Sequence, residues 1–435
     1  MKRIFTSILL LMTLSLGALK VHAADLDINA PSYILIDPDT GLVLAEKSPD
    51  EKMYPASTTK IMTAIIALEQ GDLNQVMTAS EKAVALESGA MHIGIMPGEQ
   101  IKLEDLINAL LIRSANDTAN IIAENIGPTY EDFIGQMNKK AQELGATNTH
   151  FVNPHGMHDN SHYTTVRDMA KIAAYAMKNE KFREIVKKPY YDMSPTNKHE
   201  KWDRLYTINR FLTNLQEYKS EYFTAIGIKP GYTSQAGNTL VSAGVNDDGM
   251  ELIAVVFGVV SSNNSSDIYE CSKELLEYGF INFSRQKLIG SGQIVKNIHV
   301  EEAAENPSLN LLSESEVSAV LPNDQDLSFP EINIVLNSAN FSAPISKGEV
   351  LGYMEFKKDG VVLGKTNLVA SRSIEEDSSG KTAEASETVE ETSEKNGAGK
   401  FFTSLAIALG AFILLRISLR RISRIVHSRK RKYKS

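Results

Sequence analysis

Residues 54–64 read YPASTTKIMTA, which places Ser57 three positions before Lys60 at the start of an apolar run. Residues three apart on a helix share one face, so the Lys60 side chain can reach the Ser57 hydroxyl. A serine becomes nucleophilic beside a base, and lysine can be that base if it is neutral near pH 7. Ser57 could instead be a helix N-cap, because a serine oxygen readily accepts an orphan backbone N–H.

The Ser-x-x-Lys spacing alone does not decide between these readings. The chain contains three matches: Ser57/Lys60, Ser284/Lys287 and Ser378/Lys381. The second has no partner motif after it, and the third lies in a polar stretch that could not hold a rigid site.

Two further motifs favour catalysis at the first match. The stretch LLIRSANDTAN holds Ser114-Ala115-Asn116 at a break in a helical pattern, and GIKPGYT holds Lys229-Pro230-Gly231 at the start of a strand pattern. An ordered S-x-x-K, S-x-N and K-[T/S]-G set is a signature of penicillin-binding proteins and class A β-lactamases. Together with THFVNPHGMHDNSHYTTVRDMA between them, these motifs resemble the low-molecular-mass penicillin-binding proteins, the serine-type D-alanyl-D-alanine carboxypeptidases.

This resemblance implies three catalytic residues. Ser57 would attack the carbonyl between the two terminal D-alanines of a peptidoglycan stem peptide and form an acyl-enzyme, which water then hydrolyses. Lys60 would take the Ser57 proton, and Ser114 would relay a proton toward the leaving amine. No cofactor is implied, and β-lactams would be covalent inhibitors.

The resemblance also implies a set of substrate-binding residues. Asn116 would hold the substrate amide and the Lys60 side chain. Lys229 would receive the terminal carboxylate and keep Lys60 neutral, and Tyr232 would supply the second oxyanion N–H. Gly231 lies beside them in the motif, and Thr233 and Arg210 would assist in binding the substrate.

One position departs from the family pattern. The third motif usually reads Lys-Thr-Gly, and this chain has Pro230 in place of the threonine. Proline supplies neither a hydroxyl nor an N–H to the substrate carboxylate. A missing hydroxyl in a polar site is worth roughly 1–3 kcal/mol, so we expect slower catalysis, with Thr233 close enough in sequence to compensate.

The sequence pattern predicts an α+β catalytic domain over residues 24–287. Strand patterns at 32–48 and 239–260 bracket helical patterns at 57–70, 103–126, 130–145 and 165–179. The resemblance implies a serine β-lactamase/transpeptidase-like fold, in which an antiparallel sheet carries a helical subdomain. Short apolar runs separated by turns then predict a small all-β domain over residues 288–370.

The two ends of the chain predict export and anchoring. Residues 1–23 combine Lys2 and Arg3, an apolar run and a small-x-small cleavage site, as in a signal peptide. Residues 371–400 predict a flexible acidic stalk, and the apolar residues 401–419 predict a membrane helix. The basic tail 420–435 would be cytoplasmic, so the protein would stand on the outer face of the plasma membrane, in a Gram-positive type of envelope.

The charge of the chain and its cysteine content argue against several other classes of function. The formal net charge is −9, but residues 24–415 hold 54 acidic and 33 basic residues, a net −21. An acidic body disfavours nucleic-acid binding. The one cysteine, Cys271, excludes an internal disulfide or a cysteine-based zinc cluster.

Three alternatives compete with the carboxypeptidase hypothesis. A zinc site could form from the histidines of residues 150–162, although their turn-rich segment gives no common helix face and we predict no metal. A class A β-lactamase would need a glutamate four residues before an asparagine, and no glutamate between the second and third motifs has that spacing. A catalytically weak or inactive peptidoglycan-binding scaffold is favoured only by Pro230. The clustered histidines are His150, His155, His158 and His162.

Overall fold

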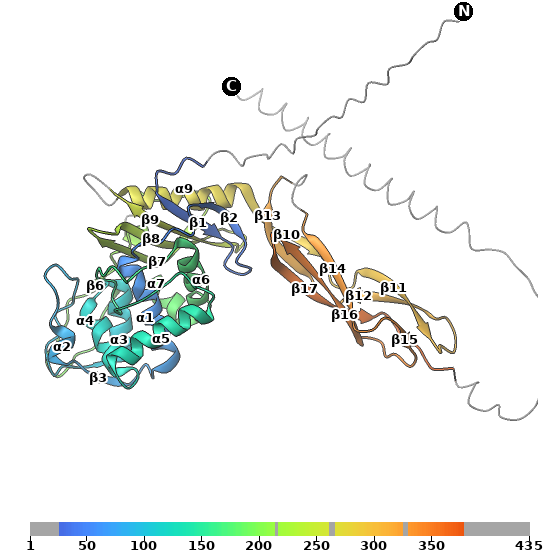
Figure 1. Cartoon of the computed structure of the whole chain (residues 1–435), viewed down its shortest axis with the longest axis horizontal. Helices are drawn as coiled ribbons and strands as arrows, with labels where there is room; N and C mark the ends of the chain where they lie inside the picture. The colour runs from blue at the N-terminus through green and yellow to red at the C-terminus, as the bar shows by residue number, and fades with distance from the viewer. Residues whose placement is uncertain (1–25, 214–215, 261–265, 325–328, 378–435) are drawn as a thin grey trace, which may run out of the picture. The chain divides into compact units, whose positions relative to one another are not determined.

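The computed structural model describes residues 26–213, 216–260, 266–324 and 329–377. They form an α+β catalytic domain followed by an all-β domain (Figure 1), as the sequence predicted. The predicted signal peptide, the membrane helix and the basic tail lie outside the described residues, as does the stalk from residue 378 onward. Within the described ranges, no helix is both long and apolar enough to cross a membrane.

One five-stranded antiparallel sheet organises the catalytic domain. Its order is β2-β1-β9-β8-β7, so the N-terminal strand β1 lies between β2 and the much later β9, with Ser32 opposite Phe257. The strands are β1 (Ser32–Ile36), β2 (Val43–Lys47), β7 (Thr224–Thr233), β8 (Gly237–Val245) and β9 (Glu251–Val259). Strand β7 lies at the sheet edge, where a peptide could be added.

The chain between β2 and β7 forms the helical subdomain. It begins with the 3-10 helix η1 (Ala56–Thr59), which leads directly into α1 (Lys60–Gln70). The other helices are α2 (Glu81–Val84), α3 (Leu103–Ile112), α4 (Asn116–Asn125), α5 (Tyr130–Glu143), α6 (Val166–Ala176), α7 (Glu180–Val186) and α8 (Arg210–Thr213). Two short strand pairs complete it: β3 (Val76–Thr78) with β4 (Gln100–Lys102), and β5 (Tyr190–Tyr191) with β6 (Leu205–Tyr206).

The inner strands β1, β8 and β9 are buried on both faces, which explains why β1 and β9 are almost continuously apolar. Successive residues of a strand point to opposite faces. Ile34 and Ile36 of β1 therefore pack with the helical subdomain, whereas Tyr33 and Leu35 pack with residues of α9 (Ser266–Asn282). Figure 1 shows α9 along the sheet on the side opposite α1 and α6.

The all-β domain contains a six-stranded sheet and a two-stranded sheet. The six-stranded order is β14-β16-β17-β12-β11-β15, and β10 pairs with β13. The strands are β10 (Phe283–Ile289), β11 (Ile294–Glu301), β12 (Ser308–Ser313), β13 (Val317–Pro322), β14 (Glu331–Leu336), β15 (Phe341–Ser342), β16 (Val350–Lys358) and β17 (Val361–Ala370). Val300, Leu309, Leu311, Phe356 and Leu368 form its fully buried core.

The ordered chain differs from the predicted limits of this domain at both ends. The predicted boundary at 287/288 falls inside β10, because Phe283 is buried and already begins that strand. Pairing also continues beyond residue 370, where the stalk was predicted to begin. Ile374 is buried and bridges Ile345, and Glu376 bridges Ala303. A single isoleucine among polar residues gives too weak a pattern to reveal this last strand-like segment.

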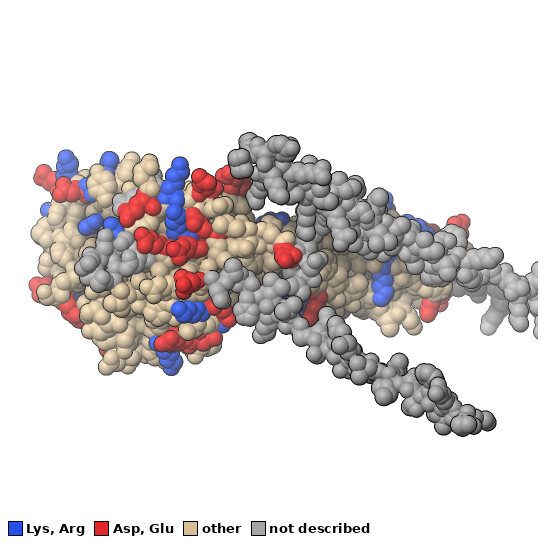
Figure 2. Space-filling model, turned by 90° about the horizontal axis from the view of Figure 1, so that it is seen from above, with Lys and Arg blue, Asp and Glu red and all other residues tan. Residues whose placement is uncertain are grey.

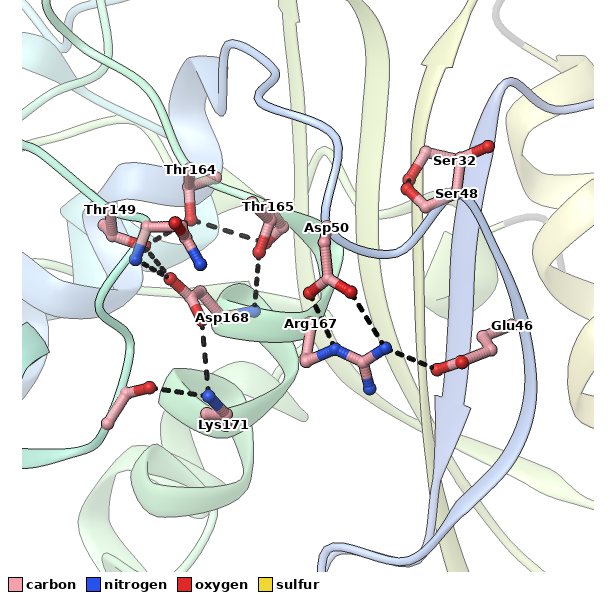
Figure 3. A network of polar contacts seen from close by, with 12 residues as sticks. Ser32, Glu46, Ser48, Asp50, Thr149, Thr164, Thr165, Arg167, Asp168 and Lys171 are labelled. Carbon is pink, nitrogen blue, oxygen red and sulfur yellow. Dashed lines mark hydrogen bonds and ion pairs between the residues drawn. The ribbon is translucent and has the colours of Figure 1, made fainter.

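A polar network around α6 holds the segment of Asp50, which leads toward the first motif, and the loop of residues 148–149 (Figure 3). The Asp168 carboxylate is buried, and it accepts hydrogen bonds from the Asn148 backbone N–H at 2.7 Å and the Thr149 hydroxyl at 3.0 Å. Nearby, Arg167 makes an exposed ion pair with Asp50 at 2.8 Å. The two interactions lie on the same helix but differ sharply in burial.

We predict that Asp168→Asn lowers the free energy of unfolding by about 1–3 kcal/mol, because an amide nitrogen replaces one of the buried acceptors. Asp50→Asn should cost at most about 1 kcal/mol, since exposed ion pairs contribute little. Urea unfolding of both variants measures the difference. Equal losses would show that Asp168 does not anchor this loop.

Candidate active site

The first motif places Ser57 beside Lys60 at the junction of η1 and α1. Lys60 is fully buried, and Ser57 is only partly buried and so stays reachable. The Lys60 Nζ donates to Ser57 Oγ at 3.1 Å and to the His155 carbonyl at 2.7 Å. Ser57 lies inside η1, and the N-cap of α1 is Thr59, without a side-chain cap bond. The structure therefore does not use Ser57 as an N-cap.

The backbone before Ser57 is held in an unfavourable conformation. Ala56 has φ +49°, which costs a non-glycine residue of order 1–3 kcal/mol unless its surroundings impose it. The Thr59 hydroxyl donates to the Ala56 carbonyl at 2.8 Å. It therefore fixes this turn from within the motif.

His162 supports the same turn from a distant part of the chain. Its Nε2 lies 2.8 Å from the Thr59 hydroxyl, and its Nδ1 accepts the Val152 N–H at 3.2 Å. Because Thr59 already donates to Ala56, the His162 Nε2 must carry the proton. Burial lowers the pKa of His162 to about 4, so the ring is neutral at pH 7 and can act as this bridge.

The loop of residues 153–156 delivers the second acceptor for Lys60. Gly156 has φ +87°, and a Cβ there would lie 1.8 Å from the Ala56 carbonyl oxygen, so only glycine fits. The Thr63 hydroxyl donates to the Pro154 carbonyl at 2.5 Å, which ties the loop to α1. The sequence offered His155 only as one of the clustered histidines, and the role of its carbonyl was missed because a backbone acceptor has no sequence signature of its own.

The second motif lies at the break between α3 and α4. Ser114 has φ +59°, the left-handed conformation in which glycine usually follows a helix. Its Oγ is buried and has no hydrogen-bond partner among the described residues, so it is available to a substrate. Asn116 is buried at the start of α4. The second motif therefore contains a buried serine hydroxyl, that of Ser114, whose hydrogen-bonding capacity is unused among the described residues.

Asp117, the residue that follows the second motif, connects two segments of the chain. Its buried carboxylate accepts the Thr118 N–H at 2.9 Å and also the Ile93 N–H at 3.1 Å. It thereby ties the segment around residue 93 to the second motif. The sequence did not reveal this contact, since nothing near Asp117 signals residue 93.

The third motif brings β7 against the Ser57 backbone. A Cβ on Gly231 would lie 2.8 Å from the Ser57 backbone nitrogen, so a glycine is needed for this close approach. Lys229 is fully buried, and its Nζ donates to the Pro230 carbonyl at 2.9 Å. Pro230 remains within β7, opposite Leu240, because an edge strand tolerates a missing N–H.

The structure connects the other three predicted binding residues less closely to Ser57 and Lys60. Tyr232 is 65% exposed at the edge strand beside Gly231. The Thr233 hydroxyl accepts the Ala236 N–H at 3.1 Å and thus belongs to the β7–β8 turn. Arg210 begins α8, where its charge partly opposes the rise in the pKa of Tyr269 that burial causes. The roles of these three residues toward a substrate stay predictions.

Burial controls the protonation of the two lysines. Burial first, and then the positive charge of Lys229, hold the pKa of Lys60 well below its usual value, although Asp117 opposes this effect. Burial also lowers the pKa of Lys229 to about 7. These shifts favour the neutral amine at Lys60, the form that can accept a proton, while Lys229, with its pKa near 7, keeps part of its charge at neutral pH.

The four clustered histidines make separate contacts. His150 Nδ1 lies 2.6 Å from the Ser161 carbonyl, and His158 packs edge-on against Tyr54. His155 Nδ1 accepts the Met157 N–H at 3.2 Å, and His162 supports Thr59. Across the described ranges, no three His, Cys, Asp or Glu side chains are placed to hold a metal ion.

Two family models match this chain. Residues 19–261 match the D-alanyl-D-alanine carboxypeptidase family, and residues 283–376 match the C-terminal domain of penicillin-binding protein 5. Together these matches cover the all-β domain and the α+β domain up to residue 261, with α9 lying between them.

Individual relatives extend over most of the chain. The D-alanyl-D-alanine carboxypeptidase DacF of Bacillus subtilis is 30% identical over 86% of this chain and 95% of its own length. DacA of Haemophilus influenzae is 29% identical over 83% of this chain and 91% of its own. A crystal structure of penicillin-binding protein 5 from Haemophilus influenzae, 29% identical, superposes with a TM-score of 0.63 over 80% of this chain and 98% of that one.

We predict that Gly231→Ala slows acylation of Ser57 by a fluorescent β-lactam about 100-fold. The added methyl group would collide with the Ser57 nitrogen and with Thr239 Oγ1, and a displacement of about 1 Å at a reacting centre can cost this much. Gly135→Ala is the matched control, because a Cβ there meets nothing within 4 Å. An acylation rate in Gly231→Ala equal to that of the control would refute the close approach.

Proposed function

Since this chain belongs to the D-alanyl-D-alanine carboxypeptidase family, we propose that it acts through an acyl-enzyme on Ser57. The protein is a serine-type D-Ala-D-Ala carboxypeptidase, so its substrates are peptidoglycan stem peptides that end in D-Ala-D-Ala. The observation that supports Ser57 as nucleophile is its 3.1 Å hydrogen bond with a fully buried lysine.

Acylation begins with proton transfer from Ser57 to Lys60. The Ser57 Oγ forms a bond with the carbonyl carbon of the penultimate D-alanine, and the carbonyl oxygen becomes an oxyanion. The backbone N–H groups of Ser57 and Tyr232 stabilise this charge, as an oxyanion hole requires. The C–N bond then breaks, and the proton held by Lys60 reaches the leaving amine through the Ser114 hydroxyl.

Deacylation returns the enzyme to its starting state. Water adds to the acyl carbon and loses a proton to Lys60, and the same proton restores the Ser57 hydroxyl when the ester bond breaks. Lys229 attracts the carboxylate of the terminal D-alanine during the first half of the cycle. Pro230 leaves Lys229 without a neighbouring threonine hydroxyl. The carboxylate therefore loses one hydrogen bond but keeps its ionic interaction with Lys229.

The cellular location follows from the segments outside the described residues. We infer export by the signal peptide 1–23 and anchoring by the apolar helix 401–419, with the basic tail 420–435 inside. The Ser- and Glu-rich stretch between residue 377 and the anchor has the composition of a flexible spacer. It would let the catalytic domain act on peptidoglycan some distance above the membrane.

Release of D-alanine from diacetyl-Lys-D-Ala-D-Ala tests the proposed reaction. A soluble protein of residues 24–400 should release one D-alanine per peptide, whereas Ser57→Ala should lose at least about 1,000-fold in kcat, since no nucleophile remains. Penicillin should abolish the release by wild-type protein.

Release that persists in Ser57→Ala would refute the assignment of the nucleophile. If wild-type protein reacts covalently with penicillin at Ser57 but releases no D-alanine, the failure lies in binding the terminal carboxylate. Pro230→Thr should then restore release. If it does not, the protein acts as a peptidoglycan-binding scaffold.

The protonation of Lys229 predicts the alkaline limb of the pH profile. Lys229 attracts the substrate carboxylate only when protonated, so kcat/KM should fall as pH rises through about 7, the pKa set by burial. Bound carboxylate favours the charged lysine, so kcat should fall at higher pH than kcat/KM. A kcat/KM that stays level from about pH 6 to 9 contradicts this role, because kcat/KM reports the free enzyme.

A further inference from the structure

A cavity of about 530 Å³ lies beside the second motif. Six of its lining residues are His92, Arg113, His199, Lys201, Trp202 and Tyr206. They come from three chain segments, and each segment is tied to the motif. Arg113 directly precedes Ser114, the Asn116 N–H donates to the Met91 carbonyl at 2.7 Å, and the Ile208 N–H donates to the Ile112 carbonyl at 3.1 Å.

The cavity carries unused positive charge. Of its cations, Arg204 is already neutralised by a two-bond pair with Asp192, at 2.8 Å for each bond. Lys201 is exposed and forms no ion pair within the described ranges, and Arg113 has only a long bond of 3.5 Å to the Tyr206 carbonyl. Asp203 is the one carboxylate in the lining, so two available cations face one anion.

Aromatic and donor groups complete the wall. The Trp202 ring stacks on His199 with centroids 4.0 Å apart, and Tyr206 is 59% exposed. His199 is held in place by Glu99, whose carboxylate lies 2.7 Å from Nδ1. The Trp202 indole N–H is buried without an acceptor among the described residues. Cations and flat rings together suit an anionic, partly apolar peptide segment.

We propose that this cavity is a subsite for the acyl side of the stem peptide, where Lys201 and Arg113 bind a carboxylate upstream of D-Ala-D-Ala. The inference rests on the proposed function, because Lys229 already takes the terminal carboxylate at β7. The acyl chain must leave the scissile carbonyl in another direction, past Asn116. The backbone of Asn116 is itself bonded to Met91, the neighbour of the lining residue His92, so a peptide that passes Asn116 would run toward this cavity.

Two pentapeptides that differ in one group test the subsite. Both have the sequence L-Ala-γ-D-Glu-L-Lys-D-Ala-D-Ala, but the glutamate α-carboxylate is free in one and amidated in the other. In wild-type protein, kcat/KM should favour the free acid about tenfold, the factor that about 1.4 kcal/mol of charge-assisted binding gives. The double variant Arg113→Gln/Lys201→Gln should reduce this ratio to about twofold or less.

Lys198→Gln is the matched control, since Lys198 is exposed on the same segment but does not line the cavity. It should keep the tenfold ratio. Comparing two peptides within each variant cancels any change in folding or in the catalytic centre. A wild-type ratio near one, or an unchanged ratio in the double variant, would overturn the inference.

Peptide binding to Ser57→Ala separates the subsite from catalysis. Calorimetry should show the same preference for the free acid, and adding Arg113→Gln/Lys201→Gln should remove it. If wild-type protein releases no D-alanine but this preference appears, the proposed function fails and the subsite stands. If release occurs and neither peptide is preferred in binding, the subsite fails and the function stands.

Discussion

The burial of two lysines in one site is the constraint on which the rest of this structure depends. Removing an ammonium from water is costly, and two neighbouring ammonium groups repel each other in a low-dielectric interior. Lys60 and Lys229 are both fully buried, and Asp117 is the carboxylate whose charge opposes the fall in the pKa of Lys60. One lysine must therefore give up its proton, and this is how a serine gains a base at neutral pH.

The surrounding fold holds that arrangement at a cost in backbone strain. Ala56 and Ser114 both take positive φ values. The turn at Ala56 is held by Thr59, which His162 contacts from a distant part of the chain. The loop of His155 accepts from Lys60 and fits against Ala56 only because Gly156 has no side chain. The sheet contributes its edge strand, which Gly231 lets approach the Ser57 nitrogen. The antiparallel sheet and the helical subdomain are thus joined at the nucleophile.

The sequence predicted the fold class and the three motifs because these depend on short-range patterns. Spacing placed Lys60 beside Ser57, and strand patterns at both ends of the domain indicated a sheet enclosing helices. Long-range contacts could not be predicted in this way. Nothing in the pattern linked His162 to Thr59 or Asp117 to Ile93, because each pair depends on loop paths. The last paired segment at Ile374 was missed for a similar reason: one apolar residue gives no periodicity.

Direct titration of the two lysines is the measurement that tests this account most closely. Lysine side chains labelled with ¹⁵N at Nζ can be followed by NMR across pH and assigned with Lys60→Met and Lys229→Met. The account predicts that Lys60 is a neutral amine at pH 7 and that Lys229 loses its proton near pH 7. It further predicts that Lys229→Met raises the pKa of Lys60. Two fully protonated lysines at neutral pH would contradict the account.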